Sequence, residues 1–388
     1  MNFFEQVPDR RGTRSAKWDL VKSLYGSDDV LPMWVADMDF PAPPPVTDAL
    51  VERAKHGVFG YTLTDPSINK LITNWLRKRH DWQVNQSRII YSPGVISTLH
   101  IAMQTITEPE DSILIQTPVY PPFYDVVKKH NRRLIKNPLK FTNNRYEIDF
   151  DDFEAKLKMG VKAFILCNPH NPVGRVWTKQ ELQRMGELCV KYDVFIFSDE
   201  IHADLIFPGH KHIPIASLSD ELSNRTLTCM SPTKTFNLAG LQASYAVVED
   251  KQLREQVVEN FKKQGMGMLN TMAVTAMEAA YKEGETWLDE LIEVLEKNKK
   301  LVVDTIQGRS DISIINPEGT YLLWFDCRKL GMSHPDLKKF MQEQAKLGLN
   351  DGISFGEEGE GFMRMNIACP TTTVHEGINR LVNALEKR

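Results

Sequence analysis

Short apolar runs alternate with amphipathic segments between about residues 88 and 248. Seven such runs are rich in β-branched and aromatic residues, as strands are: RIIYS, SILIQ, RRLIK, KAFILC, DVFIFSD, LTCMS and SYAVV. KAFILC and DVFIFSD are almost continuously apolar, which is typical of parallel strands that are buried on both faces. The pattern therefore predicts an α/β fold in which a mainly parallel sheet lies between helices.

The C-terminal part of the chain has a different pattern. Residues 285–308 repeat apolar positions at helical spacing and end at Gly308, which predicts a long connecting helix. The strand-like runs YLLWFD and FMRMNIA follow, with helical segments near 334–347 and 373–387, so we expect a smaller α+β domain. Near the other end, the proline-rich stretch FPAPPPV (40–46) marks the end of an N-terminal arm.

The length of the chain agrees with this division. Its 388 residues exceed the size at which single cores stop growing, roughly 250 to 300 residues. We expect an N-terminal arm over 1–45 that joins the small domain, a large domain over 46–284, and the connecting helix with the small C-terminal domain over 285–388.

Composition and charge narrow the classes of function. A chain with 42% hydrophobic and 25% charged residues is typical of a folded soluble protein. A net charge of −4 gives no basic footprint for nucleic acid, and no run of Lys or Arg suggests a membrane surface. The N-terminal residues include charges where a signal peptide has an apolar core, and no apolar run approaches membrane-spanning length. We therefore expect small molecules as partners.

The five cysteines are odd in number, widely spaced and mostly within apolar stretches. None forms a Cys-x-x-Cys pair, so neither a structural zinc site nor thiol redox chemistry is indicated. Reduced, buried thiols predict a cytoplasmic protein.

Polar clusters directly follow five of the predicted strands: SPGVIS, TPVYPPFY, NPHNPVG, SDEIHAD and SPTKTFN. In open parallel sheets the ligand crevice lies beyond the carboxyl ends of the strands. We therefore expect these clusters to meet in one site.

Lys234 follows the apolar run LTCM after three residues, so its amine is expected at a strand end. An isolated lysine is more often a surface residue. A lysine that forms a Schiff base must lose its proton near neutral pH although its free pKa is about 10.4, and burial at a junction between strand and loop permits that loss.

Asp199 and Glu200 end the run DVFIFSDE in the same row of strand ends. Paired carboxylates also bind metals or begin helices. Beside a pyridine nitrogen, an aspartate keeps the ring protonated, and the ring can then accept the electron pair left when a Cα bond breaks.

Other residues of these clusters allow both a structural and a functional interpretation. The glycine turn of SPGVIS can point backbone N–H groups at a phosphate or form an ordinary strand-to-helix turn. Asn171 and Gly174 suit a turn, and Asn171 could also donate to a ring oxygen. Tyr120 and Tyr124 could pack in the core or stack on a planar cofactor.

Arg364 lies within the apolar run FMRMNIA, where an unpaired charge is costly. It requires an anionic partner, either in a structural salt bridge or in the α-carboxylate of a substrate.

A metal site is not expected. His202, His210 and His212, with Asp199 and Asp204, could suggest one, but the histidine spacing of eight and two matches no ordinary zinc pattern. His210 and His212 accompany a Pro-Gly turn and are expected to be solvated loop residues.

Taken in order, GYT (60–62), SPGVIS, the Tyr120 segment, NPHNPVG, SDEIH, SPTKTFN and RMN (364–366) resemble the fold-type I pyridoxal 5′-phosphate (PLP) enzymes of the aspartate aminotransferase superfamily. The resemblance covers essentially the whole chain. MWVADMDFPAP (33–43), SDEIHAD and SPTKTFNLAG are similar to the cystathionine β-lyase or C–S lyase branch, of MalY/PatB type. This resemblance implies a large domain with a mainly parallel seven-stranded sheet between helices, plus a smaller α+β domain.

The resemblance also implies a role for each matching position. Lys234 corresponds to the catalytic Schiff-base lysine and Asp199 to the partner of the pyridinium. The further cofactor contacts that it implies are Asn171, His202, Tyr120, Ser231, Gly94, Val95, Ile96 and Tyr61. Tyr61 is expected to reach the phosphate of the neighbouring subunit, which implies a homodimer. The implied substrate contacts are Arg364, at the α-carboxylate, with Asn171, Ala36 and Tyr124.

Two positions depart from the pattern of aminotransferases. His202 stands where a tyrosine is common three residues after the aspartate, and Gln242 stands where many have an arginine eight residues after the lysine. Gln242 therefore removes one expected counter-charge of the phosphate.

The function that these features predict is α,β-elimination from cystathionine or a related S-substituted L-cysteine, with pyruvate, ammonia and a thiol as products, as in methionine biosynthesis. An aminotransferase shares the first steps and is one alternative. A PLP-binding regulatory protein without useful turnover is another.

Overall fold

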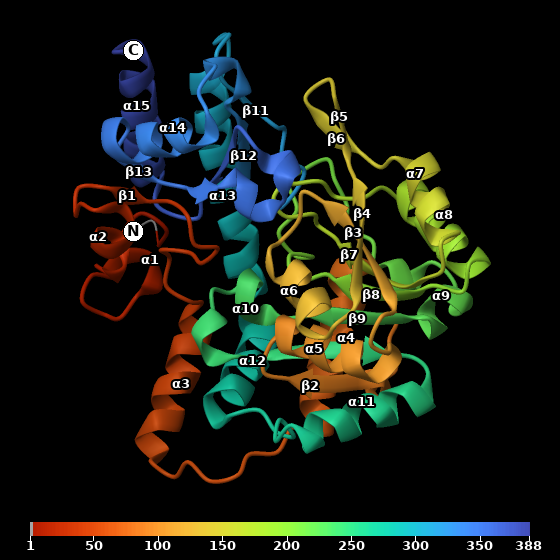
Figure 1. Ribbon diagram of the computed structural model, residues 1–388. Helices are drawn as coiled ribbons and strands as arrows, with labels where there is room; N and C mark the ends of the chain where they lie inside the picture. The colour runs from red at the N-terminus through yellow and green to blue at the C-terminus, as the bar shows by residue number, and fades with distance from the viewer. Residues whose placement is uncertain (1–2) are drawn as a thin grey trace.

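The computed structural model describes residues 3–388 (Figure 1). Its largest sheet contains the strands β2 (Ile89–Ser92), β3 (Ser112–Thr117), β4 (Arg133–Pro138), β7 (Val161–Cys167), β8 (Phe195–Asp199), β9 (Thr226–Met230) and β10 (Ser244–Val248). They lie in the order β2-β10-β9-β8-β7-β3-β4. Among these seven, β10 alone runs against its neighbours. The mainly parallel sheet predicted from the apolar runs is therefore confirmed, as are the seven strands that the resemblance implies.

The apolar runs form strands because both faces of this sheet are covered. Along β7, Ala163, Ile165 and Cys167 pack into one core cluster, whereas Phe164 and Leu166 pack into another. Side chains of a strand alternate between the two faces, so a continuous run of apolar residues fills both cores.

Helices form the two outer layers. One face of the sheet is covered by α5 (Val95–Ile106), α6 (Pro122–Lys129) and α11 (Lys251–Lys263). The opposite face is covered by α4 (Pro66–His80), α7 (Phe150–Leu157), α8 (Lys179–Lys191), α9 (Asp220–Asn224) and α12 (Thr271–Glu283). A capping box between Thr178 and Glu181 begins α8, since each side chain bonds the other's backbone N–H.

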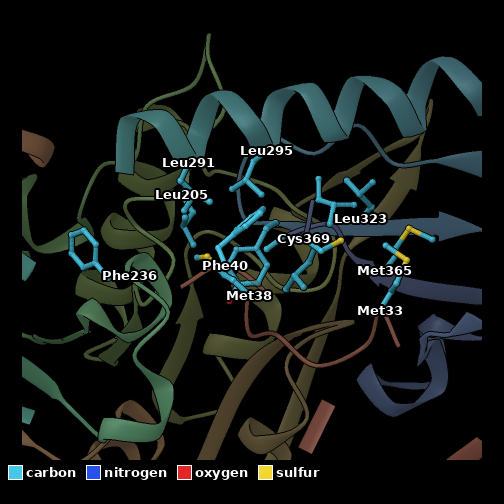
Figure 2. Packing of buried hydrophobic residues seen from close by; sticks show 14 of the residues in the cluster. Met33, Met38, Phe40, Leu205, Phe236, Leu291, Leu295, Leu323, Met365 and Cys369 are labelled. Carbon is cyan, nitrogen blue, oxygen red and sulfur yellow. The ribbon is translucent and has the colours of Figure 1, made fainter. Parts of the chain in front are cut away.

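The predicted connecting helix is α13 (Glu285–Ile306), which leads from α12 to the C-terminal sheet (Figure 1). Figure 2 shows Leu291 and Leu295 of α13 above buried residues from distant parts of the chain, among them Phe40, Leu205 and Cys369. This cluster joins the N-terminal segment, the large sheet and the C-terminal part in one core.

A second sheet lies in the C-terminal part of the chain. It contains β11 (Ser313–Ile314), β12 (Leu322–Asp326), β14 (Asn350–Asp351) and β15 (Phe362–Asn366), which pair antiparallel in the order β11-β12-β15-β14. The helices α14 (His334–Lys339) and α15 (Thr371–Glu386) accompany it. The runs YLLWFD and FMRMNIA thus form strands, and the predicted mixture of helices and strands is confirmed.

The helix predicted near 334–347 ends earlier than expected. After α14 the chain makes a π-helical turn over Phe340–Gln344 and then forms β13 (Leu347–Gly348). β13 pairs in parallel with β1 (Leu31–Pro32), a partner that local periodicity does not reveal. This pairing attaches the N-terminal segment to the C-terminal part.

The remaining elements are short or peripheral. They are α1 (Ala16–Asp19), α2 (Val21–Tyr25), α3 (Pro44–His56), α10 (Pro232–Thr235) and the hairpin of β5 (Lys140–Thr142) with β6 (Arg145–Glu147). The prolines of FPAPPPV begin α3, because proline is tolerated in the first helical turn. Within residues 3–388, no helix is both long and apolar enough to span a bilayer.

Candidate active site

A cavity of about 220 Å³ lies at the carboxyl ends of the parallel strands. Cys167 ends β7 and Asp199 ends β8, and the two are paired in register. Tyr120 follows β3, and Lys234 follows β9 on the one-turn helix α10. The strand-end clusters therefore meet in one place, as the parallel sheet predicted.

Nine of the predicted site residues line this cavity: Ala36, Gly94, Val95, Ile96, Tyr120, Asn171, Asp199, His202 and Lys234. Gln242 lines it as well. The residues come from segments as far apart as the N-terminal arm and β9, so the fold assembles the site from most of the chain.

Lys234 is held at the cavity by its backbone and by one carbonyl. Ser231 caps α10 by accepting a hydrogen bond of 3.0 Å from the backbone N–H of Thr233. The Nζ of Lys234 donates to the carbonyl oxygen of Ala36 at 2.6 Å. Burial lowers the pKa of Lys234 to about 8, with the charge of Asp37 acting against the shift. The amine is consequently much easier to deprotonate than a solvated lysine.

Asp199 faces the same cavity with its charge poorly compensated. Burial raises the pKa of its carboxyl group to about 7, and the neighbouring Glu200 acts in the same direction. Its side chain accepts one hydrogen bond, at 3.1 Å, from the backbone N–H of Ile201. A cation beside Asp199 would favour the charged carboxylate.

His202 brings a neutral imidazole to the cavity. Burial lowers its pKa to about 3, and the charges of Lys234 and Arg364 add to the shift. Its Nδ1 is buried without a hydrogen-bond partner among residues 3–388, and its ring lies edge-on to Tyr321 at 5.8 Å. A buried polar atom without a partner at a cavity wall suits contact with a ligand.

The motif SDEIHAD sends side chains in two directions. Asp199 and His202 line the cavity, whereas Glu200 accepts hydrogen bonds from Ser198 Oγ at 2.7 Å and His212 Nε2 at 2.8 Å. The expectation that His212 is solvated was wrong, because the buried carboxylate of Glu200 requires that donor. His210 is exposed, and the described residues contain no group of three or more potential metal ligands.

Asp204, the last residue of this motif, anchors the helix that carries Lys234. Its carboxylate accepts hydrogen bonds from Trp75 Nε1 at 3.0 Å and from Thr235 Oγ1 at 2.8 Å, and His80 Nε2 lies 3.0 Å away. Burial alone would raise the pKa of Asp204, but His80 and Thr235 lower it. Because Thr235 follows Lys234 directly, the anchor limits movement of α10.

Arg364 lies on β15 as a buried cation. It donates to Asn171 Oδ1 at 2.8 Å, to the carbonyl oxygen of Trp34 at 3.1 Å and to Asn350 Oδ1, and its guanidinium lies 4.8 Å from the centre of the Phe355 ring. Its hydrogen-bond partners among residues 3–388 are these neutral oxygens, and its Nε has none. Burial lowers the pKa of Arg364 to about 10, so it remains charged at neutral pH. The alternative of a structural salt bridge therefore does not account for this arginine.

Four predicted contacts do not line this cavity. One is Arg364, which is joined to the wall through its hydrogen bond to Asn171. The hydroxyl of Tyr124 donates to the carbonyl of Phe355 at 2.8 Å. The hydroxyl of Ser231 lies 2.6 Å from the carbonyl of Ala243, and the following Thr233 lines the wall instead. Tyr61 is 95% exposed and lies outside the wall of this chain's cavity.

Sequence reasoning also missed residues of the site. Ser97, the last residue of SPGVIS, and Thr233 both line the cavity with hydroxyl groups. Both residues belong to strand-end clusters that were expected to meet in the site, and this position could have indicated them. Tyr321, whose hydroxyl donates to Ala36 at 2.8 Å, belongs to the run YLLWFD and carries no local signal at all.

The residues present suit the predicted PLP. Asp199 offers a carboxylate to a ring nitrogen, and Tyr120 offers an aromatic face. Gly94 caps α5, whose first N–H groups have no partners within the helix and can face a phosphate. The buried polar atom of His202 remains to be satisfied by a ligand of this kind.

Comparison with known proteins gives a consistent picture. The sequence profile described as aminotransferase class I and II matches residues 28–381. Cystathionine β-lyase PatB of Bacillus subtilis is 45% identical over 98% of this chain and 99% of its own length. Protein MalY of Escherichia coli is 32% identical over 98% of each chain. The structure of cystalysin from Treponema denticola, which contains PLP, has a TM-score of 0.96 and 36% identity, and covers 100% of this chain and 99% of its own. The resemblance proposed from the motifs is confirmed.

The buried histidines predict how stability depends on pH in the cofactor-free protein. Burial lowers the pKa of His170 to about 4 and that of His202 to about 3, and also lowers that of His212. Below about pH 6.5 the unfolded chain binds protons that the folded chain does not, so each histidine removes up to about 1.4 kcal/mol of stability per pH unit. Asp199, whose pKa is raised, acts in the opposite direction but is one group against three. Urea unfolding should give a lower free energy of unfolding at pH 5.5 than at pH 7.5.

The variant His202→Asn provides the control for this prediction, because it removes one of the three titrating groups. Its free energy of unfolding should fall less steeply with acidification than that of the unmodified chain. Equal free energies at the two pH values in the unmodified chain would contradict the account.

Proposed function

The chain belongs to the class I and II aminotransferase family, and on this basis we propose that it is a PLP-dependent carbon–sulfur lyase of cystathionine β-lyase type. It catalyses α,β-elimination from cystathionine or related S-substituted L-cysteines, which gives pyruvate, ammonia and a thiol. The observation that carries the chemistry is the cavity shared by Lys234 and Asp199, with the unpaired cation of Arg364 beside it. The 45% identity to a cystathionine β-lyase supports elimination over transamination as the reaction.

Each end of the cofactor has a residue suited to it. The carboxylate of Asp199 pairs with the ring nitrogen, and this pairing offsets the cost of its burial. Lys234 is the residue that binds the aldehyde carbon, Tyr120 contacts the ring face and Asn171 lies in reach of a ring oxygen. When bound, PLP supplies a ring that accepts the electron pair left when the Cα–H bond breaks.

Arg364 and Lys234 have different roles, because one binds the substrate and the other transfers a proton. Arg364 stays charged and binds the α-carboxylate, a stronger acceptor than the neutral oxygens of Asn171 and Trp34 that it now contacts. Lys234, whose pKa burial lowers to about 8, is neutral often enough to take the Cα proton as a general base.

The phosphate would be held without a cation at position 242, because the neutral Gln242 lines the cavity there. The first turn of α5, with the hydroxyl groups of Ser97 and Thr233, provides neutral donors at the cavity wall. We assign a further donor to Tyr61 of the partner subunit.

A homodimer is supported by an exposed apolar patch around Tyr61. Val58 is 63% exposed, Phe59 59%, Leu63 81% and Met268 59%. Apolar side chains gathered on the surface in this way mark an interface, and a second copy of the chain is the partner that completes the site.

The domain organisation and the cellular location are also part of the proposal. We propose an N-terminal arm over 1–45, of which residues 1 and 2 lie outside the described chain, a large domain over 46–284 and a small domain over 285–388. Pairing of β1 with β13 supports assignment of the arm to the small domain. Five buried free thiols support a reducing compartment, the cytoplasm, and a place in amino-acid metabolism such as methionine biosynthesis.

The central prediction is elimination without a second substrate. Purified holoenzyme mixed with cystathionine, in the absence of any 2-oxo acid, should form pyruvate and thiol over many turnovers, because the thiolate leaves Cβ after Cα loses its proton. Pyruvate is measured by coupled reduction and the thiol by a colorimetric reagent. Turnover that requires an added 2-oxo acid would assign an aminotransferase instead. Bound cofactor with no product from a broad panel of amino acids would assign a regulatory protein.

A second prediction concerns Lys234. The variant Lys234→Ala should fold and dimerise but lose the absorption band of the lysine-linked cofactor, with activity reduced by roughly 10²- to 10⁴-fold through loss of the general base. Lys251→Ala, on the exposed first turn of α11, is the matched control and should keep both band and activity. A retained band in Lys234→Ala would remove the residue from this role.

A third prediction tests whether Tyr61 acts across the interface. Tyr61→Ala should weaken cofactor binding, and Lys234→Ala should be inactive. When both variants are unfolded together and refolded, mixed dimers contain one site with an intact Lys234 and the other chain's intact Tyr61. At a PLP concentration that leaves Tyr61→Ala largely without cofactor, activity should therefore rise above that of either variant alone. Differential tagging shows whether mixed dimers have formed. If they have formed and activity does not rise, Tyr61 and Lys234 act within the same chain.

A further inference from the structure

The carbonyl oxygen of Ala36 accepts hydrogen bonds from two side chains of different parts of the chain. Lys234 Nζ donates to it at 2.6 Å, and the hydroxyl of Tyr321 donates to it at 2.8 Å. Tyr321 directly precedes β12 and is 0% exposed. Its own carbonyl accepts from the backbone N–H of Ile367 at 2.9 Å, so its backbone is fixed to the C-terminal sheet.

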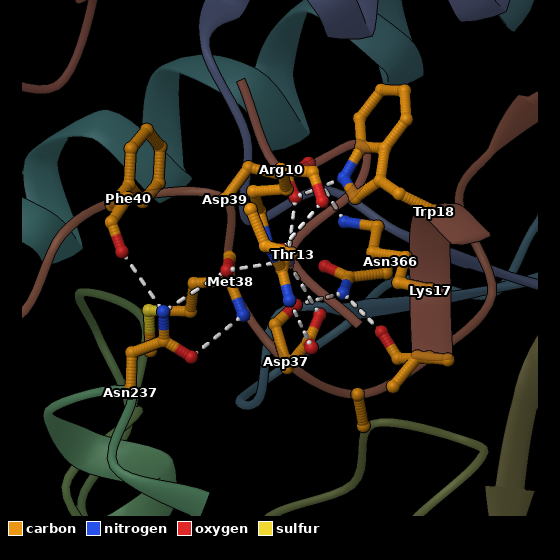
Figure 3. Close-up of polar contacts among 12 residues, drawn as sticks. Arg10, Thr13, Lys17, Trp18, Asp37, Met38, Asp39, Phe40, Asn237 and Asn366 are labelled. Carbon is orange, nitrogen blue, oxygen red and sulfur yellow. Dashed lines mark hydrogen bonds and ion pairs between the residues drawn. The ribbon is translucent and has the colours of Figure 1, made fainter. Parts of the chain in front are cut away.

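The segment that carries this carbonyl is held on both sides of Ala36. Figure 3 shows that Asn237, three residues after Lys234, accepts from the N–H of Met38 at 3.0 Å and donates to its carbonyl at 2.9 Å. Asn366, two residues after Arg364, donates to the carbonyls of Val35 and Asp37. The segment is thus tied both to the lysine-bearing loop and to the strand of the substrate-binding arginine.

A partly buried network of ion pairs contacts the segment through Asp37 and Asp39 (Figure 3). Arg10 Nη2 lies 2.6 Å from Asp37 Oδ2, and Arg10 Nη1 lies 2.7 Å from Asp39 Oδ1. Lys17 Nζ lies 2.8 Å from Asp39 Oδ2, with side chains that are 1% and 4% exposed. These ion pairs hold Asp37, the residue after Ala36, whereas the carbonyl of Ala36 itself is bound by Tyr321 and Lys234.

We infer that Tyr321 is a positioning residue for Lys234, and that it acts through the shared carbonyl of Ala36. The inference rests on the proposed function. When Lys234 takes the Cα proton, the electron pair of the C–H bond stays on the substrate and the amine becomes an ammonium. The Ala36 carbonyl accepts a hydrogen bond from that ammonium, and Tyr321 keeps the carbonyl oriented for it.

Tyr321 also limits how strongly the carbonyl holds the proton on Lys234. Its hydroxyl points the positive end of its dipole at the same oxygen, close to the ammonium, and so disfavours the charged lysine. The other charges that face Lys234 are Asp37 and Asp199, which favour the ammonium, and Arg364, which opposes it, while His202 is neutral. Removal of the hydroxyl should therefore raise the pKa of Lys234.

The test uses holoenzyme of the variant Tyr321→Phe and an exchange reaction that needs substrate binding and proton transfer at Lys234 but no leaving group. L-Alanine is incubated with enzyme in D₂O, and loss of the Cα proton is followed by NMR. Exchange should be about tenfold slower than in the unmodified enzyme near pH 7, and the gap should narrow toward about pH 9, where more of the lysine is neutral. Cofactor content and KM for alanine should change little.

Tyr281→Phe is the matched control. It removes another buried tyrosine hydroxyl, which contacts the hydroxyl of Tyr245 at 3.5 Å, and should leave the exchange rate and its pH profile unchanged. A loss in Tyr321→Phe that is the same at every pH would indicate a merely structural effect and overturn the inference. An unchanged rate would overturn it too.

Elimination rates separate this role from direct proton donation to the leaving group. Tyr321→Phe should slow elimination by the same factor for cystathionine and for an S-aryl-L-cysteine with a better leaving group. A loss that disappears with the better leaving group would make Tyr321 an acid for the thiolate and overturn the positioning role. An unmodified enzyme that neither exchanges alanine nor eliminates would instead refute the proposed function itself.

Discussion

Removal of Lys234 and Asp199 from water is the constraint on which the site depends. Burial disfavours the charged form of both groups, so it makes the lysine easier to deprotonate and the aspartate easier to protonate. The first effect suits the proposed abstraction of a proton by Lys234. A cationic ring nitrogen beside Asp199 would reverse the second effect. Arg364 follows the same principle, since its buried charge is compensated only by neutral acceptors and suits an anionic substrate.

Much of the architecture could be predicted because its causes are local. Apolar runs such as KAFILC become strands buried on both faces, and the strand ends place Lys234 and Asp199 together through the geometry of a parallel sheet. The direction of individual side chains could not be predicted in the same way. Tyr124 turns toward Phe355 and His212 toward Glu200, and both partners are remote from the local pattern. Tyr321 illustrates the limit, because its role depends on a carbonyl 285 residues away.

The motif SDEIHAD contains residues that line the cavity and residues that bind other parts of the protein. Asp199 and His202 face the cavity, while Glu200 and Asp204 bind partners behind it. Asp204 accepts a hydrogen bond from Thr235, the neighbour of Lys234. A residue of the motif that lies outside the cavity therefore helps to hold Lys234 in place. Asp199 and His202 line the cavity, and Glu200 and Asp204 do not.

The hydrogen bonds from Arg364 to Trp34 and from Asn366 to Val35 join positions 330 and 331 residues apart. On a ribosome, the segment around Ala36 emerges first and β15 almost last. A nascent or prematurely terminated chain therefore lacks a finished pocket, even when the large sheet is already complete. The pocket can therefore be completed only after β15 has emerged and bound the segment around Ala36.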